Sequence, residues 1–354
     1  MKIVLKFGTS TLIDEKGDPK TAVFNEIAST VHQLYKEHSL TIVASGAAMI
    51  GAKKLGFEKR PKKIEELQVA SSLGQVPLMN SFIDSFHDLG VKVAQVLLTK
   101  NILEDRQQYL NTKTTLNLLI DKNIVPIINE NDTVSTEELS YGDNDRLSAM
   151  VAQIISSDKL IIFTDTEGLF QENPEFVQNP DLVESIEYKS EQLEEIIKTA
   201  DSKKGIGGFT TKILASQIAG YSGIDTHITD WNSSSLDSIL SGKKIGTHIL
   251  PSSKRIPSRK LWIGFGMVST GAFTVDSGAE EALTKKNASL LYKGLSKYGK
   301  EINKGDCITV FNIKEVPIAK GITSWSSDEI SKAFKADNSA NSKPVIHKDN
   351  LIIL

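Results

Sequence analysis

Short apolar runs alternate with longer amphipathic stretches from the amino terminus to about residue 250, and this alternation constrains the fold most. The runs are rich in Val and Ile, as in strands of a parallel sheet that is covered by helices on both faces. The expected strands are Ile3–Phe7, Leu40–Ala44, Lys92–Leu97, Ile124–Ile128, Leu160–Thr164 and Asp225–Ile228. The expected helices are Val23–Tyr35, Glu65–Leu89, Leu103–Asp121, Asp145–Ser156, Ser190–Lys198 and Lys212–Tyr221. Strands and helices in alternation predict an α/β domain.

A change of pattern near Pro251 predicts a second domain. The chain has 354 residues, and single hydrophobic cores stop growing at roughly 250–300 residues. We expect a first domain over residues 1–252, a polar linker over 253–260 and a small β-rich domain over 261–354. The expected strands of the second domain are Leu261–Ile263, Phe273–Val275, Cys307–Phe311 and Val316–Lys320, with one helix around Gly278–Lys285.

Composition narrows the class of protein. The net charge of −3 gives no global attraction to nucleic acid or membrane. The single cysteine, Cys307, excludes an intrachain disulfide and fits a reducing cytosol. The chain shows neither the features of a signal peptide nor an apolar run near the ~20 residues of a membrane helix. We therefore expect a soluble, cytoplasmic protein without a membrane partner.

Polar or glycine-rich clusters follow several expected strands, where ligands bind in open α/β sheets. Lys6 ends the first strand, and Gly8 would let backbone amides approach an anion. Ser45 and Gly46 begin a helix after the second strand, and open amides at a helix start favour a carboxylate or phosphate. A solvated lysine and a serine N-cap are the plain alternatives, and both stay open.

Acidic and amide side chains form the next cluster. In the stretches Asn129–Asp132 and Gly142–Asp145, six of eight residues are Asp or Asn. They suit recognition of a ligand ammonium group or orientation of catalytic lysines. A turn-rich loop, which Asp and Asn also favour, is the alternative.

Two further clusters fit a nucleotide. Thr164–Leu169 follows another buried-type strand, and Gly205–Lys212 combines glycines, hydroxyls and a lysine at the start of a helix. That composition has the chemistry of a phosphate cradle, although the spacing differs from a Walker A loop. A strand–turn and a flexible surface loop are the alternatives. The six histidines are scattered, and the sequence shows no metal-ligand cluster or hydrolase elbow.

Taken together and in this order, the motifs resemble those of the amino acid kinase family. The matching stretches are KFGTS from Lys6, ASGA from Ala44, SLGQ from Ser72, NENDTV from Asn129, GDNDRLSA from Gly142, FTDTEGL from Phe163 and GIGGFTTK from Gly205. The tail resembles a PUA domain through VDSGAEEAL from Val275, LLYKGL from Leu290 and the GD turn at Gly305. The resemblance implies an α/β sandwich with a mainly parallel central sheet, followed by a small β-rich PUA-like domain.

Within that family, the chain is most similar to the branch that phosphorylates the side-chain carboxylate of L-glutamate with ATP. The resemblance implies Mg²⁺ bound with the nucleotide and feedback inhibition by proline, and we expect a homo-oligomer. By position, glutamate would be bound by Ser45, Asp132 and Asn144. ATP would be bound by Lys6, Thr164, Asp165, Ile206, Gly207, Gly208, Phe209, Thr210, Thr211 and Lys212. Lys6 and Lys212 would stabilise the moving phosphoryl group, and Asp145 would orient them.

Two alternatives remain at the level of sequence. One is a kinase of another small carboxylate, such as acetylglutamate or aspartate. The other is an RNA-binding regulatory protein that acts through the PUA-like tail. Charge speaks against RNA, because the residues from Trp262 onward hold 12 lysines and no arginine against 10 acidic residues.

Overall fold

The computed structural model describes residues 1–57, 59–99, 105–134, 143–171, 180–201, 207–232, 235–253, 256–299, 301–336 and 343–354. The chain forms two compact units, one from most of the residues up to 255 and one mainly from residues 256–354. None of the helices among the described residues combines the length and the apolarity needed to cross a bilayer.

The first unit is built on an eight-stranded sheet in the order β3-β4-β2-β1-β5-β7-β8-β6. All pairings are parallel except that of β7 with β8, which is antiparallel. The six expected strands are confirmed as β1 (Lys2–Phe7), β2 (Ser39–Ala44), β3 (Lys92–Leu98), β4 (Ile124–Glu130), β5 (Lys159–Thr164) and β7 (Asp225–Asp230). Sequence reasoning missed two short strands, the edge strand β6 (Ser185–Glu187) and its neighbour β8 (Thr247–Leu250).

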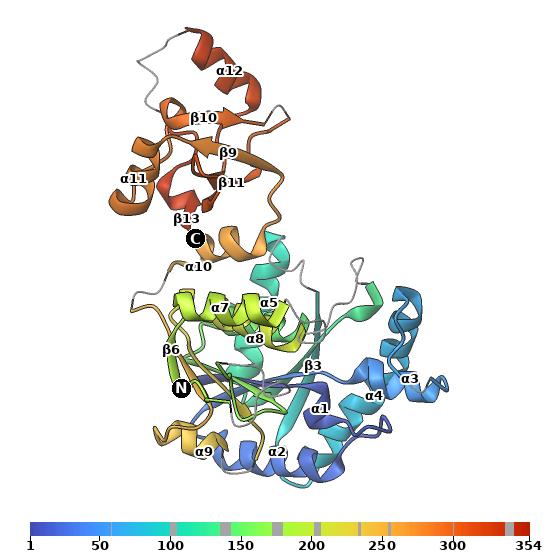
Figure 1. The fold of residues 1–354 in the computed structure, drawn as a ribbon. Helices are drawn as coiled ribbons and strands as arrows, with labels where there is room; N and C mark the ends of the chain where they lie inside the picture. Colours follow the sequence, from blue (N-terminus) through green and yellow to red (C-terminus); the bar gives the residue numbers. More distant parts are fainter. Residues whose placement is uncertain are drawn as a thin grey trace. The chain divides into compact units, whose positions relative to one another are not determined.

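Helices cover both faces of this sheet (Figure 1). They are α1 (Thr9–Leu12), α2 (Thr21–Leu34), α3 (Ala47–Lys54), α4 (Ile64–His87), α5 (Arg106–Asp121), α6 (Asp143–Ile154), α7 (Glu191–Asp201), α8 (Gly207–Tyr221) and α9 (Ser235–Leu240). Residues of α2, α4 and α9 share one buried apolar cluster with alternate residues of β1, β2 and β5. Helices α6 and α8 pack on each other, α6 also on β1 and β5, and α8 on β7. The predicted α/β sandwich with a mainly parallel sheet is thus confirmed.

Helices α3 and α4 pack closely on each other beside the carboxyl end of β2, at the sheet edge where ligands are expected. A Cβ atom on Gly74 would lie 1.8 Å from the carbonyl oxygen of Ala47, and one on Gly51 would lie 1.7 Å from that of Ala70. Only glycine allows backbones to come this close. The turn before α3 also needs glycine, because Gly46 has φ of +120°. The small residues noted after β2 therefore bring the start of α3 against α4.

The second unit holds a five-stranded sheet in the order β10-β9-β11-β12-β13. Its elements are α10 (Ser258–Leu261), a π-helical turn (Trp262–Gly266), β9 (Gly271–Val275), α11 (Ser277–Lys286), β10 (Leu295–Tyr298), β11 (Cys307–Phe311), β12 (Pro317–Ile322), α12 (Ser327–Ala336) and β13 (Leu351–Ile353). Short 3-10 turns cover Tyr292–Gly294 and Lys348–Asn350, as one covers Asp132–Val134 in the first unit. This β-rich unit agrees with the expected PUA-like tail, while the domain bounds and the 253–260 linker remain proposals.

One prediction in this unit is wrong, and one helix was not predicted. Leu261–Ile263 is not a strand, because these residues end α10 and begin the π-helical turn. Leu261 and Ile263 are both buried, and this alternation of apolar residues also occurs in strands. A second helix, α12, was missed although Ser326 and Glu329 form a capping box at its start. The backbone amide of Ser326 donates to Oε2 of Glu329 over 2.9 Å, and the amide of Glu329 donates to Oγ of Ser326 over 3.4 Å.

Candidate active site

A cavity of about 740 Å³ lies in the first unit, where β1, β2, β4 and β5 end. The carboxyl ends of parallel strands meet at one edge of a sheet, so residues far apart in sequence converge there. Eight of the predicted site residues line this cavity: Lys6, Ser45, Asp132, Asn144, Asp145, Thr164, Asp165 and Lys212. The structure therefore brings residues of six separate segments to one place.

The centre of the cavity is the carboxylate of Asp145, which lies between two lysines. Lys6 at the end of β1 forms an ion pair with Oδ1 of Asp145. Nζ of Lys212, in the second turn of α8, lies 3.5 Å from Oδ2. Oγ1 of Thr211 donates a hydrogen bond of 2.7 Å to the same oxygen. One carboxylate thus fixes ammonium groups that come from opposite ends of the domain's sequence.

Burial shifts the pKa values of the charged groups in this cluster. Lys6 and Asp145 are almost fully buried. Burial lowers the pKa of Lys6, and the charge of Asp145 only partly offsets this. Burial alone would raise the pKa of Asp145, but the two ammonium groups and the hydrogen bonds from Lys6 and Thr211 hold it below its ordinary value. Two lysine side chains held around one carboxylate suit the stabilisation of an anion.

Amide groups organise the opposite side of the cavity. Nδ2 of Asn144 lies 2.8 Å from Oγ of Ser45, 3.1 Å from the carbonyl oxygen of Ala44 and 2.9 Å from Oδ1 of Asn129. Asn129 in turn donates from Nδ2 to Oε1 of Gln75 over 2.7 Å. Within the described residues, the buried Oδ1 of Asn144 accepts no hydrogen bond. This oxygen can accept from a ligand ammonium group.

The segments predicted to hold a nucleotide lie around Lys212 and the end of β5. Oγ1 of Thr164 donates to Oδ1 of Asp165 over 3.0 Å, and both residues line the cavity. Helix α8 begins at Gly207, five residues before the predicted start, so Gly207, Gly208, Phe209, Thr210 and Thr211 form its first turns. Ile206 lies outside the described residues. The amino end of a helix is a place where backbone amides can bind phosphate, and α8 begins within the predicted segment.

Sequence reasoning missed several residues that line the cavity, among them Ser10, Lys20, Glu130 and Arg60. Nζ of Lys20 donates to the carbonyl oxygen of Ser10 over 2.6 Å. Ser10 and Glu130 stand inside motifs that were recognised, so their positions were within reach. Arg60 lies in a loop between α3 and α4 that carries no motif, and only the fold brings it to the cavity.

Comparison with protein families decides what kind of domain carries this cavity. The model of the amino acid kinase family matches residues 1–230, well over half of the chain. The chain belongs to the amino acid kinase family. In this kinase, a PUA domain model also matches residues 271–343, within the second unit.

Relatives of the kinase extend over its whole length. Glutamate 5-kinase of Thermoanaerobacter sp. (strain X514) is 38% identical over 364 aligned residues, which cover 100% of this chain and 98% of the relative. Glutamate 5-kinase of Prochlorococcus marinus subsp. pastoris is 36% identical, and the alignment covers 99% of this chain and 99% of the relative. Among solved structures, UMP kinase from Bacillus anthracis aligns with a TM-score of 0.50 at 12% identity, covering 71% of this chain and 96% of that one. The last likeness shows a common fold alone.

Proposed function

We propose that this kinase transfers the terminal phosphoryl group of ATP to the side-chain carboxylate of L-glutamate. The product is L-glutamyl 5-phosphate, and the reaction is the first step of proline biosynthesis. Relatives named glutamate 5-kinase align with the chain from end to end, including the PUA domain. The observation that carries the mechanism is the buried arrangement of Lys6, Asp145 and Lys212 in the cavity.

The chemistry needs charge stabilisation rather than a base. A glutamate side chain has an ordinary pKa of about 4.3, so at neutral pH it is already the nucleophile. The obstacle is repulsion between this carboxylate and the phosphate groups of ATP. Catalysis of phosphoryl transfer relies mainly on positioning and on neutralising charge at the transferred group. Two lysines oriented by one buried carboxylate meet that need.

The residues divide into two sides around these lysines. Thr164, Asp165 and the segment from Ile206 to Lys212 would bind ATP, together with Lys6. Ser45, Asp132 and Asn144 would bind glutamate, with Asp132 and Oδ1 of Asn144 accepting from its ammonium group. Lys6 and Lys212 would stabilise the transferred phosphoryl group, and Asp145 would hold them in place. This division follows the motifs of the family resemblance, and it is supported in so far as eight of these residues line one cavity.

Mg²⁺ would enter with the nucleotide. It prefers oxygen ligands and keeps several waters when bound to phosphates. Asp165 lines the cavity and offers a carboxylate of this type on the nucleotide side, so the donor set fits the ion. When bound, Mg²⁺ neutralises phosphate charge and orients the phosphates.

Regulation and assembly belong to the same proposal. Feedback inhibition by proline is proposed from the family resemblance. A homo-oligomer is supported by Val69, Leu73 and Val76 of α4, which are 52%, 43% and 64% exposed at helical spacing along one face. The single, buried Cys307 fits a cytoplasmic location.

An acceptor panel tests the reaction. ATP consumption is measured with glutamate, N-acetylglutamate, aspartate and carbamate, each with and without proline. We expect kcat/KM for glutamate to exceed that for every other acceptor by about 100-fold or more, because a shorter chain or a blocked ammonium group leaves polar site groups unpaired. A higher value for another acceptor would contradict the glutamate assignment. An unchanged rate with proline would remove only the proposed inhibition.

The glutamate side of the cavity is tested by Asn144→Ala. Loss of the amide removes the contact to Ser45 and the oxygen offered to the ammonium group. We expect KM for glutamate to rise about 10- to 100-fold, as for one or two lost hydrogen bonds, with KM for ATP within about threefold of its original value. Steady-state kinetics with each substrate varied gives both values, and Asn80→Ala on the exposed face of α4 is the matched control. A rise confined to KM for ATP would place Asn144 on the wrong side.

A further inference from the structure

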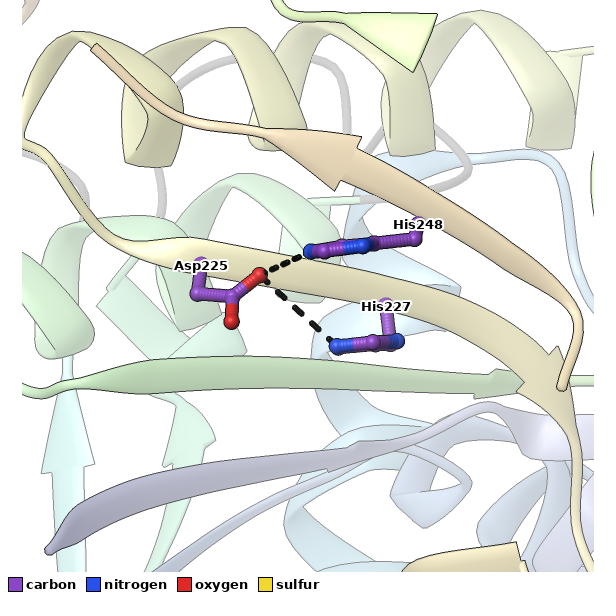
Figure 2. Close-up of side chains that lie close together, drawn as sticks. All are labelled: Asp225, His227 and His248. Atoms are coloured by element: carbon purple, nitrogen blue, oxygen red, sulfur yellow. Dashed lines mark hydrogen bonds and ion pairs between the residues drawn. The ribbon is translucent and has the colours of Figure 1, made fainter. Parts of the chain in front are cut away.

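Three side chains of metal-binding type meet on β7 and β8, although the histidines look scattered in the sequence. Asp225 and His227 stand two residues apart on β7, so both side chains project from one face of the sheet. His248 on β8 lies directly opposite His227 in the antiparallel register. In the part of the chain that the structure describes, these three residues form a group that could hold a metal ion. One ligand atom from each lies within 4.8 Å of the other two. Figure 2 shows a nitrogen of each imidazole turned toward the carboxylate of Asp225.

The contacts place two nitrogens around one carboxylate oxygen. Nε2 of His248 is hydrogen-bonded to Oδ1 of Asp225, and Nε2 of His227 lies 3.7 Å from the same oxygen. The two imidazoles are stacked, with ring centres 4.3 Å apart and planes within 4° of parallel. Ligand atoms on one zinc ion lie at most about 4.2 Å apart, since each bond is about 2.1 Å. Small side-chain rotations would bring all three atoms within that limit.

His227 gives the observation that points to a ligand. Its side chain is only 8% exposed, and neither ring nitrogen makes a hydrogen bond to any described residue. A buried polar group without a partner is costly, so one that persists calls for an explanation. Metal ions bind imidazole through the lone pair of a ring nitrogen, and neither nitrogen of His227 is hydrogen-bonded to a described residue. His248 has a side chain 34% exposed and offers a route for an ion from solvent.

Lys159 on β5 completes the surroundings of the cluster. Its ammonium group contacts Oδ2 of Asp225, which leaves the Oδ1 side facing the two histidines. The positive charge of Lys159 opposes the binding of a second cation beside the same carboxylate. This opposition provides a test of the site.

We propose that Asp225, His227 and His248 form a binding site for a divalent transition-metal ion, with Zn²⁺ the best-matched ion. Two imidazoles and one carboxylate are a ligand set of zinc sites, whereas Mg²⁺ prefers oxygen ligands alone. Asp225 begins β7, while the residues of the candidate active site follow the ends of their strands. The metal ion would therefore join the antiparallel pair β7–β8 and take no part in phosphoryl transfer.

The test uses the full chain without a polyhistidine tag, stripped of metal with a chelator. Zn²⁺ is titrated in competition with a chromophoric chelator, with excess Mg²⁺ present to fill oxygen-rich sites. We expect one Zn²⁺ per chain, and at least a 100-fold weaker affinity for His248→Ala. His87→Ala removes an exposed histidine at the end of α4 and is the matched control, with unchanged affinity. Lys159→Gln removes the opposing charge and should tighten binding on the order of tenfold.

Two further measurements separate a metal site from a purely structural network. Zn²⁺ should raise the Tm of the unmodified chain and of His87→Ala but not that of His248→Ala. Co²⁺ bound to the unmodified chain should give visible absorption bands of a nitrogen-ligated site. Equal Zn²⁺ affinity in the unmodified chain and His248→Ala would overturn the proposal. A Co²⁺ spectrum without such bands would overturn it even if His248→Ala fails to fold.

Discussion

Replacing Lys212 by alanine is expected to lower kcat about a thousandfold, equivalent to about 4 kcal/mol of transition-state stabilisation, as for other preorganised charge donors. The ammonium group is fixed within the cavity, with Nζ 3.5 Å from Oδ2 of Asp145. A positive charge at that place acts on negative charge that moves during the transfer, so its loss should appear in kcat. KM for glutamate should change by less than about threefold, because the glutamate side of the cavity is formed by other residues. Steady-state and single-turnover kinetics with glutamate and ATP measure both effects.

Two further variants separate the loss of the charge at position 212 from the loss of a lysine elsewhere in the chain. Lys189→Ala removes a lysine that lies over the ring of Tyr221, outside the cavity lining. We expect kcat within about twofold of the original value, as for a residue away from the reacting groups. Lys212→Arg keeps the charge and should recover part of the lost rate. If Lys212→Ala keeps kcat within tenfold, the assigned role is wrong.

The sequence predicts the parallel part of the fold because burial on both faces marks each strand. β1, β2 and β5 are buried along almost their whole length, and their Val- and Ile-rich runs carry that signal directly. The site follows from the same signal, since parallel strands end at one edge and bring Lys6 and Thr164 together. A motif at a strand end can therefore be placed without coordinates.

Features that depend on long-range packing were not accessible in this way. The start of α8 at Gly207 was missed because glycine is a poor helix former and hides the first turn. Arg60 reaches the cavity from a loop without any motif. His227 and His248 are neighbours only through the register of β7 with β8, and β8 itself was not predicted. The register between two strands depends on tertiary packing, which the local sequence pattern of either strand does not encode.

Replacing Asp145 by asparagine should damage both stability and turnover, because it leaves the buried ammonium group of Lys6 without its counter-charge. Breaking a buried ion pair by removing one partner costs about 3–5 kcal/mol. We expect the free energy of unfolding to fall by an amount of this size in denaturant titrations. Asp84→Asn, an exposed carboxylate on α4, is the matched control and should change stability by less than about 0.5 kcal/mol.

The pH dependence of the same variant tells a catalytic role from a purely structural one. In the original chain, the charge of Asp145 raises the pKa of Lys6 against the effects of burial and Lys212. Without that charge the pKa of Lys6 falls further, so more of the lysine is neutral at a given pH. Turnover by Asp145→Asn should therefore rise, relative to that of the original chain, as pH is lowered within the range where glutamate stays ionised. A rate profile that matches the original chain in height and shape would show that Asp145 does not hold Lys6 in its charged form.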